Sequence, residues 1–227
     1  MTGQQPLHDH GHQGDDAADT VTDEAFWDER YRSRDALWSG NPNPQLVAEA
    51  VDLVPATALD VGCGEGADAI WLSERGWQVT AVDISAVALE RGAAQAAERG
   101  ADIARRIEWR HEDLTAWPPA EAAYDLVSAQ FLHLPKETRE EVFRVLAAAV
   151  APSGSLLIVG HHPSDLRTTI PRPPRPELFF TASEVAGSLD PRQWDIVVSA
   201  AREREAVDPA GRTVTIHDAV LRARRKV

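Results

Sequence analysis

A glycine-rich turn directly after a short apolar run constrains this chain more than any other feature. The run at residues 56–61 ends at glycines and therefore indicates a buried strand, and the turn at 62–66 reads Gly-Cys-Gly-Glu-Gly. Glycines let the backbone pass close to a ligand, and the helix expected at 67–75 would offer free N–H groups at its start. This order predicts a ligand-binding crevice at the carboxyl end of the strand.

Strand and helix signals then alternate along the chain. Apolar runs at 78–82, 107–110, 124–129 and 155–160 indicate strands, and helical spacing favours helices at 86–99 and 136–150. Such alternation predicts a parallel sheet covered on both faces. Two β-rich stretches, 194–204 and 212–222, are joined by Asp-Pro-Ala-Gly and predict an antiparallel hairpin. We therefore expect an α/β, Rossmann-like doubly wound sheet of five parallel strands plus a C-terminal antiparallel hairpin.

The two ends of the pattern define the expected domain organisation. Residues 1–20 hold few apolar side chains and are expected to form an acidic, histidine-containing tail, while 21–227 form the domain. His8, His10 and His12 are compatible with a metal-binding tail, but we favour a mobile tail without metal because metal sites need ligands in a fixed geometry. Asp23 and Pro44 are placed to begin two helices within 21–53. The proline-rich stretch 163–176 is expected to lack regular structure.

Charge and cysteine content limit the partners. The chain has 227 residues, with 23 Lys and Arg against 36 Asp and Glu, for a net charge of −13. Such a charge repels phosphate backbones and anionic lipids, so we expect neither a nucleic-acid nor a membrane partner. The single cysteine, Cys63, excludes an intramolecular disulfide and suits a reducing compartment. No apolar stretch is long enough for a transmembrane helix and no secretory signal is apparent, so we expect a cytoplasmic protein.

An acidic residue ends the next expected strand. Asp83 can accept hydrogen bonds from both hydroxyls of a ribose, which together with the glycine turn indicates a nucleoside-containing cofactor. The glycines stand at 62, 64 and 66, and this spacing does not fit the pyrophosphate fingerprint G-x-G-x-x-G. The turn also lacks the Lys-Ser/Thr pair of a triphosphate-binding loop.

Residues 59–85 resemble motif I and its acidic successor in class I S-adenosylmethionine (SAM)-dependent methyltransferases. The resemblance extends over most of 23–224: residues 110–114 are similar to the segment that meets adenine, 130–133 to the segment beside the methyl donor, and 151–157 to the turn before the fifth strand. The sequence Phe-Trp-Asp-Glu-Arg-Tyr at 26–31 resembles the entry segment of small-molecule enzymes such as tellurite-resistance and thiopurine S-methyltransferases. That likeness implies a helical lid at 21–53.

The resemblance implies SAM as the cofactor and a role for each matching residue. Asp60 and the turn would hold the methionine end, Asp83 the ribose, Ile84 and Leu114 the faces of adenine, and Asp113 its amine. The full implied cofactor set is Asp60, Gly62, Cys63, Gly64, Glu65, Gly66, Asp83, Ile84, Asp113, Leu114 and Gln130.

Each of these positions also has a plain structural interpretation. Asp60 could cap a strand end, Asp83 a helix, and Asp113 a surface turn in which Glu112 competes for its role. A nucleophilic role for Cys63 is rejected, because nothing in the sequence argues for a lowered thiol pKa.

Two histidines follow strands at the same edge of the sheet. His133 and His161 are candidates for lining the acceptor pocket and for acting as general base, although a lone histidine more often serves packing. Tyr31 and Trp38 are the expected aromatic pocket residues. Phe179 and Phe180 would form an opposite wall, where Arg172 and Arg175 either meet an anionic acceptor or face solvent.

The function expected from the resemblance is methyl transfer from SAM to a small-molecule acceptor by in-line displacement. Gln-Phe-Leu-His at 130–133 replaces the Asn/Asp-Pro-Pro-aromatic motif of base and glutamine-amide methylases and argues against that chemistry. The alternatives are an RNA or protein methyltransferase and a non-catalytic SAM- or nucleoside-binding module. A nicotinamide dehydrogenase is disfavoured by the glycine spacing.

Overall fold

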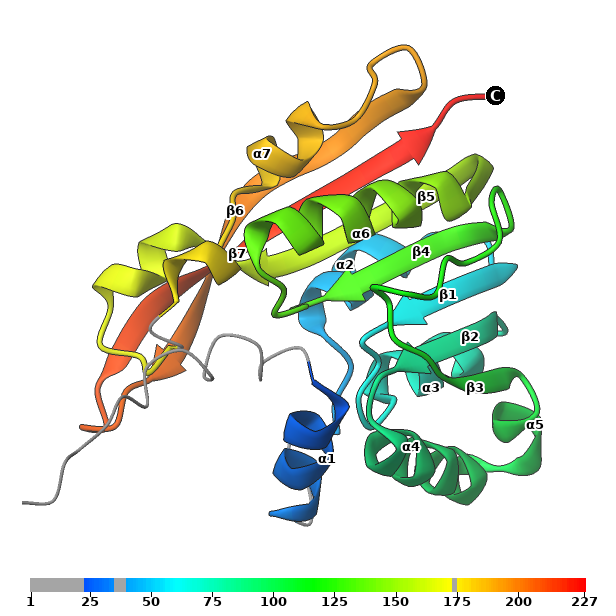
Figure 1. The fold of residues 1–227 in the computed structure, drawn as a ribbon, viewed down its shortest axis with the longest axis horizontal. Coiled ribbons are helices and arrows are strands. Elements are labelled where there is room, and N and C mark those ends of the chain that lie inside the picture. Colours follow the sequence, from blue (N-terminus) through cyan, green and yellow to red (C-terminus); the bar gives the residue numbers. More distant parts are fainter. Residues whose placement is uncertain (1–22, 35–39, 173–174) are drawn as a thin grey trace, which may run out of the picture.

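A seven-stranded mixed sheet organises the computed structural model, which describes residues 23–34, 40–172 and 175–227 (Figure 1). The tail at 1–20 and Trp38 lie outside the described residues. The strand order is β3-β2-β1-β4-β5-β7-β6. The strands are β1 (Thr57–Val61), β2 (Gln78–Asp83), β3 (Ile107–His111), β4 (Tyr124–Gln130), β5 (Val150–His161), β6 (Trp194–Val207) and β7 (Thr213–Arg225).

The direction of the strands confirms the predicted fold class. Strands β1 to β5 pair in parallel, whereas β7 pairs antiparallel with both β5 and β6. The chain order reverses between β1 and β4, which lie side by side in the centre of the sheet (Figure 1). In open α/β sheets ligands bind at this switch point, beyond the carboxyl ends of the strands.

Most of the helices start where capping residues predict. They are α1 (Glu24–Arg32), α2 (Pro44–Ala50), α3 (Ala67–Glu74), α4 (Ala86–Arg99), α5 (Ala101–Ala104), α6 (Lys136–Ala149) and α7 (Ala182–Gly187). Asp23, Asn43 and Ser85 each accept a backbone N–H at a helix start, and Thr181 with Glu184 forms a complete capping box.

The expectation of no regular structure in the proline-rich stretch is wrong at one place. Pro163–Arg167 forms a 3-10 helix, and a second one, Pro176–Leu178, begins at the last proline. Both start on a proline, which suits the first position of a helical turn because the N–H that proline lacks has no helical partner there. The short helix α5 is also absent from the sequence expectation.

The two faces of the sheet bury alternate residues of the same strands. In β5, Leu156 and Ile158 belong to the apolar core beneath α6 and α7, while Leu157 and Val159 belong to the core beneath α2 and α3. A period of two with both faces apolar is what a buried parallel sheet requires. Among the described residues, no helix combines the length and apolar character needed to cross a bilayer.

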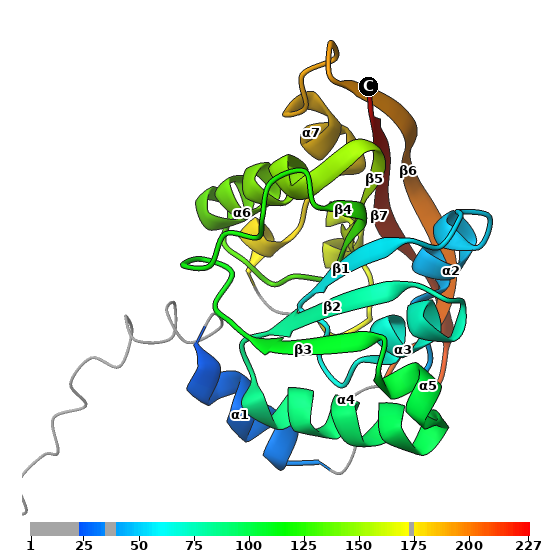
Figure 2. The ribbon, with the colours of Figure 1, turned by 90° about the vertical axis from the view of Figure 1, so that its right-hand side faces the viewer.

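The two N-terminal helices pack in different places. Helix α2 buries Leu46 and Ala50 in the core. Helix α1 instead lies beside α4 (Figure 2), where Asp28 Oδ1 accepts a hydrogen bond from Ser85 Oγ at 2.6 Å. Helix α1 therefore stands at the end of β2, next to the predicted binding edge.

Gly160 tests how tightly the α6 side of the core is packed. A Cβ at this position would lie 2.4 Å from the Phe180 ring, which is itself buried against Phe143. We expect Gly160→Ala to lower the free energy of unfolding by about 1–3 kcal/mol through overpacking, measured by urea denaturation. Gly187→Ala, with nothing within 4 Å of its Cβ, is the matched control and is expected to be neutral or stabilising. Equal stability of the two variants would contradict the packing argument.

Candidate functional site

The turn after β1 adopts a backbone conformation that residues other than glycine rarely take. Gly62, Gly64 and Gly66 have φ of 65°, 54° and 78°. A Cβ at Gly66 would lie 2.3 Å from the Trp109 ring, and one at Gly62 would lie 2.3 Å from Leu132 Cδ2. Glycine is therefore required here both by conformation and by the close approach of neighbouring side chains.

Asp83 holds the turn in place. Its Oδ2 accepts a hydrogen bond from Gly64 N at 2.8 Å, and its Oδ1 accepts one from Ser85 N, also at 2.8 Å. Burial raises the pKa of this carboxyl. Since a carboxylate has about four acceptor positions and Ile84 N also interacts with this carboxyl, it keeps capacity to accept from a ligand. Asp83 therefore stabilises the glycine turn and the start of α4, and it remains able to bind sugar hydroxyls.

Asp60 ends β1 as a buried carboxyl with an unused oxygen. The residue is 1% exposed, and its Oδ2 has no hydrogen-bond partner. Burial raises the pKa of Asp60 well above its usual value, and the charges of Asp68 and Asp83 raise it further. Asp68 accepts a hydrogen bond from Asn43 N at 2.6 Å, and burial raises its pKa to about 6. Among the described residues, no ion pair reaches any of these three carboxyls. Their charge therefore favours a cationic ligand.

Asp68 is a site residue that the sequence analysis did not assign. It lies in the first turn of α3, two positions after the last glycine of the turn. An acidic residue is common at a helix start, because it interacts favourably with the helix dipole, so its type alone gave no sign of a site. Only the fold shows that it lies close enough to Asp60 to raise that residue's pKa.

Two further residues of the turn, Glu65 and Cys63, are explained by their contacts within the protein. Glu65 is buried and pairs with Arg91 of α4 at 3.0 Å, and Arg91 also donates to the carbonyl oxygen of Arg34 after α1. Burial and the neighbouring carboxylates raise the pKa of the Cys63 thiol well above its usual value. A protonated thiol is a poor nucleophile, in agreement with the sequence argument.

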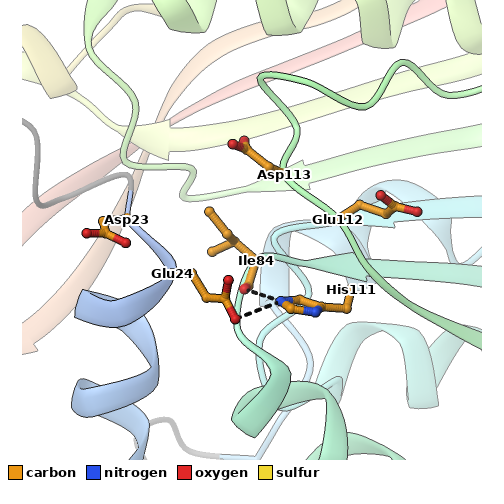
Figure 3. Close-up of a pocket in the computed structure, with 6 residues that line it drawn as sticks. All are labelled: Asp23, Glu24, Ile84, His111, Glu112 and Asp113. Carbon is orange, nitrogen blue, oxygen red and sulfur yellow. Dashed lines mark hydrogen bonds and ion pairs between the residues drawn. The ribbon is translucent and has the colours of Figure 1, made fainter.

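A cavity of about 320 Å³ lies beside the end of β2 (Figure 3). Its lining residues are Asp23, Glu24, Ile84, His111, Glu112 and Asp113. His111 Nε2 lies 2.9 Å from the carbonyl oxygen of Ile84 and 3.1 Å from Glu24 Oε1, so α1 closes one side of the cavity. The structure thus brings Ile84 and Asp113 together as expected.

The third strand's end supplies the other side of this cavity. Asp113 Oδ1 accepts hydrogen bonds from the N and Oγ1 of Thr115, at 2.8 and 2.7 Å, so the residue also stabilises the turn after β3. Leu114 does not line the cavity and packs instead against the core beneath α6.

Aromatic side chains cluster beyond β4 and β5. The His133 ring centroid lies 6.0 Å from that of Trp27 and 5.7 Å from that of His161. The His161 ring lies 4.6 Å from Phe131 and 5.9 Å from Phe179. We call these five residues the aromatic cluster. It joins α1, the segment after β4, the end of β5 and the loop before α7.

Three aromatic residues lie in or beside this cluster. Trp27 of α1 is half-buried and belongs to it. Tyr31 is buried, with its ring 6.3 Å from Trp27. Phe131 was not singled out, because its position depends on a backbone with φ of 54° directly after β4.

Both candidate histidines are neutral at physiological pH. Burial lowers the pKa of His133 to about 4, with Arg30 and Arg172 lowering it further. Burial lowers the pKa of His161 to about 3, and the charges of Arg172, His133 and Arg204 act in the same direction. Groups with such low pKa values bind protons weakly. This favours pocket lining and hydrogen bonding over proton abstraction.

Unpartnered polar atoms gather at the same edge. Of the five buried side-chain atoms without a hydrogen-bond partner among the described residues, four are Asp60 Oδ2, Gln130 Oε1, His161 Nδ1 and Arg172 Nε. Asp60, Gln130 and His161 stand at the carboxyl ends of β1, β4 and β5, and Arg172 follows β5. Buried polar atoms are normally paired, so this concentration points to a ligand.

Solved structures of other proteins share this fold. The structure of TehB from Haemophilus influenzae superposes with a TM-score of 0.66 at 21% identity, covering 89% of this chain and 67% of that one. A Burkholderia thailandensis 1,6-didemethyltoxoflavin N1-methyltransferase, solved with S-adenosylhomocysteine, superposes with a TM-score of 0.63 at 19% identity and covers 99% of this chain and 94% of that one. The chain thus has the seven-stranded methyltransferase fold.

Sequence comparison gives the same assignment. Residues 58–154 match a family described as a methyltransferase domain. An uncharacterized methyltransferase of Mycobacterium tuberculosis is 35% identical over 127 residues, which cover 55% of this chain and 61% of that protein. A 2-heptyl-1-hydroxyquinolin-4(1H)-one methyltransferase of Mycobacteroides abscessus is 28% identical and covers 54% of each chain. The chain therefore spans between half and two thirds of the length of these relatives.

These findings confirm the resemblance predicted from the sequence. Residues 58–154 match a methyltransferase domain, and they lie within a fold that solved methyltransferases share.

The two low histidine pKa values predict an acid-sensitive fold. A histidine with a pKa of about 6.5 in the unfolded chain binds a proton at pH 5, whereas His161 in the folded chain does not. Stability is therefore unaffected above the unfolded pKa and falls as pH drops below it. We expect His161→Gln to reduce the stability lost between pH 7 and pH 5 by about 2 kcal/mol, and the double variant with His133→Gln by about twice that.

Urea denaturation at the two pH values measures this difference. The raised pKa values of Asp60 and Asp68 act in the opposite direction, but they are common to all three proteins and cancel in the comparison. Identical pH dependence in the wild-type protein and the double variant would show that these histidines are protonated in the folded state.

Proposed function

We propose that this protein is a SAM-dependent methyltransferase that transfers a methyl group to a small-molecule acceptor by in-line displacement. The observation that carries the proposal is the buried Asp60, whose unpartnered Oδ2 lies at the glycine turn in an acidic environment. SAM carries an ammonium and a sulfonium, so this anionic crevice suits it.

The residues present fit the parts of this cofactor. Asp60 would take the methionine ammonium, and the free acceptor positions of Asp83 would take the ribose hydroxyls. The cavity with Ile84 and Asp113 would hold adenine, and Gln130 Oε1 would face the methyl donor. When bound, SAM supplies an electrophilic methyl group, so the protein's own work is to position the acceptor and exclude water.

A small acceptor is supported by the size and composition of the site. The aromatic cluster offers a partly apolar surface next to the switch point, which is typical of small-molecule pockets. The names of the Mycobacteroides and Burkholderia relatives state small heterocyclic acceptors for those proteins. The net charge of −13 disfavours an RNA acceptor. Helix α1 would act as the part of the 21–53 lid that covers the site, and the protein would act in the cytoplasm.

Calorimetry with SAM tests the proposal directly. We expect saturable binding by the wild-type protein and a loss of at least about tenfold in affinity for Asp60→Asn, because the ammonium loses a charged partner. Asp83→Ala should also weaken binding. Asp102→Asn removes an exposed carboxyl of α5 and is the matched control, expected to bind as the wild type does. Absence of SAM binding, or unchanged affinity in Asp60→Asn, would contradict the assignment.

Binding of a cation should also release protons. A positive ligand lowers the pKa of both Asp60 and Asp68, which burial raises, and Asp68, with a pKa of about 6, is partly protonated near pH 6. We expect SAM to release protons at pH 6, and S-adenosylhomocysteine, which lacks the sulfonium charge, to release fewer. Calorimetry in two buffers of different ionisation enthalpy measures the number released. Asp68→Asn should reduce it, and proton uptake on binding would contradict the prediction.

A further inference from the structure

Arg172 is fixed in a buried position by one side of its guanidinium. Its Nη2 donates to Asp165 Oδ2 at 2.8 Å, and Asp165 is 1% exposed. Asp165 Oδ1 in turn accepts a hydrogen bond from His217 N of β7 at 2.8 Å. The edge of the sheet therefore holds Asp165, and Asp165 holds Arg172.

One donor of this guanidinium is buried and unused. Arg172 Nε has no hydrogen-bond partner among the described residues, although the side chain is only 14% exposed. An N–H of an arginine that is buried without an acceptor is costly, and it remains favourable mainly where a ligand accepts it. Arg167, five residues earlier in the same segment, is exposed and shows the ordinary placement of an arginine.

The second unused atom belongs to a residue of the aromatic cluster. His161 Nδ1 is buried without a partner in the described part of the chain, and its ring lies near those of Phe131 and Phe179. His161 pairs with Asp218 of β7, and the neighbouring His217 donates its N–H to Asp165, the residue that holds Arg172. The strand pairing thus places Arg172 on the His161 side of the sheet edge, and its charge lowers the pKa of both His161 and His133. A neutral imidazole with its hydrogen on Nδ1 is a donor, as Arg172 Nε is.

Charge is divided across the site. The carboxyls of Asp60, Asp68 and Asp83 lie on the side of β1 and β2. On the side of β4 and β5, Arg30, Arg172 and Arg204 are the charged side chains that shift the two histidines. Two carboxylates on this side are already paired, Asp165 with Arg172 and Asp218 with Arg204.

We propose that Arg172 Nε and His161 Nδ1 form an oxyanion subsite that selects planar aromatic acceptors ionised at neutral pH, such as phenolates, N-hydroxy heterocycles or aromatic carboxylates. The rings of Phe131, Phe179, Trp27 and His133 provide the flat apolar surface for such an acceptor. The proposal rests on the proposed function. An ionised acceptor has no proton to lose, so methyl transfer to it needs no general base. The two neutral histidines can then serve in hydrogen bonding and packing.

Binding of salicylate and of its neutral analogue salicylamide tests the subsite. The full-length protein is first saturated with S-adenosylhomocysteine, and each probe is then titrated by calorimetry. We expect salicylate to bind the complex more tightly than salicylamide. Arg172→Gln should weaken salicylate at least about tenfold and leave salicylamide nearly unchanged, because a charge-assisted hydrogen bond is lost. Arg167→Gln is the matched control and should behave as the wild type does.

A second variant guards against loss of folding. Arg172→Gln leaves Asp165 buried without its cation, which is destabilising. The double variant Arg172→Gln with Asp165→Asn removes both charges and should show the same selective loss of salicylate binding. Equal affinity of the wild-type complex for the two probes, or wild-type preference in the double variant, would overturn the subsite. Failure of S-adenosylhomocysteine to bind would instead overturn the proposed function.

Discussion

The hydrogen bonds accepted by Asp83 connect the parts of the site to the sheet. One carboxylate oxygen takes the N–H of Gly64 in the turn after β1, and the other takes the N–H of Ser85 at the start of α4. Ser85 then donates its hydroxyl to Asp28 of α1. A single buried carboxylate at the end of β2 thus positions the glycine turn, the first turn of α4 and, through Ser85, the helix that closes the adjacent cavity.

A second organising feature is the separation of charge across the switch point. Buried carboxyls surround the turn after β1, where their raised pKa values show that they lack compensating cations. Arginines and neutral histidines occupy the side after β4 and β5. Such a site suits a cationic donor on one side and an anionic acceptor on the other.

Local sequence patterns predicted the fold because they act over short distances. The apolar run before Gly62, the capping residues Ser85 and Thr181 and the Asp208–Gly211 turn each depend on neighbours within a few residues. Their order along the chain is enough to predict parallel strands and a final hairpin, because crossover connections are restricted to few arrangements. The 3-10 helix at Pro163–Arg167 was missed because proline composition indicates a break in structure without saying how the break is built.

The sequence by itself determined the fold: the glycine turn, the acidic end of the following strand and the terminal hairpin indicated the methyltransferase fold. Only the tertiary structure decided how the binding edge is built. It brought Asp68 near Asp60, placed Trp27 beside His133, and left Arg172 Nε buried without a partner among the described residues. These residues are far apart along the chain or lie on separate elements. Residue type alone does not predict that they are close in space. Burial and charge at the site exist only once the sheet has assembled.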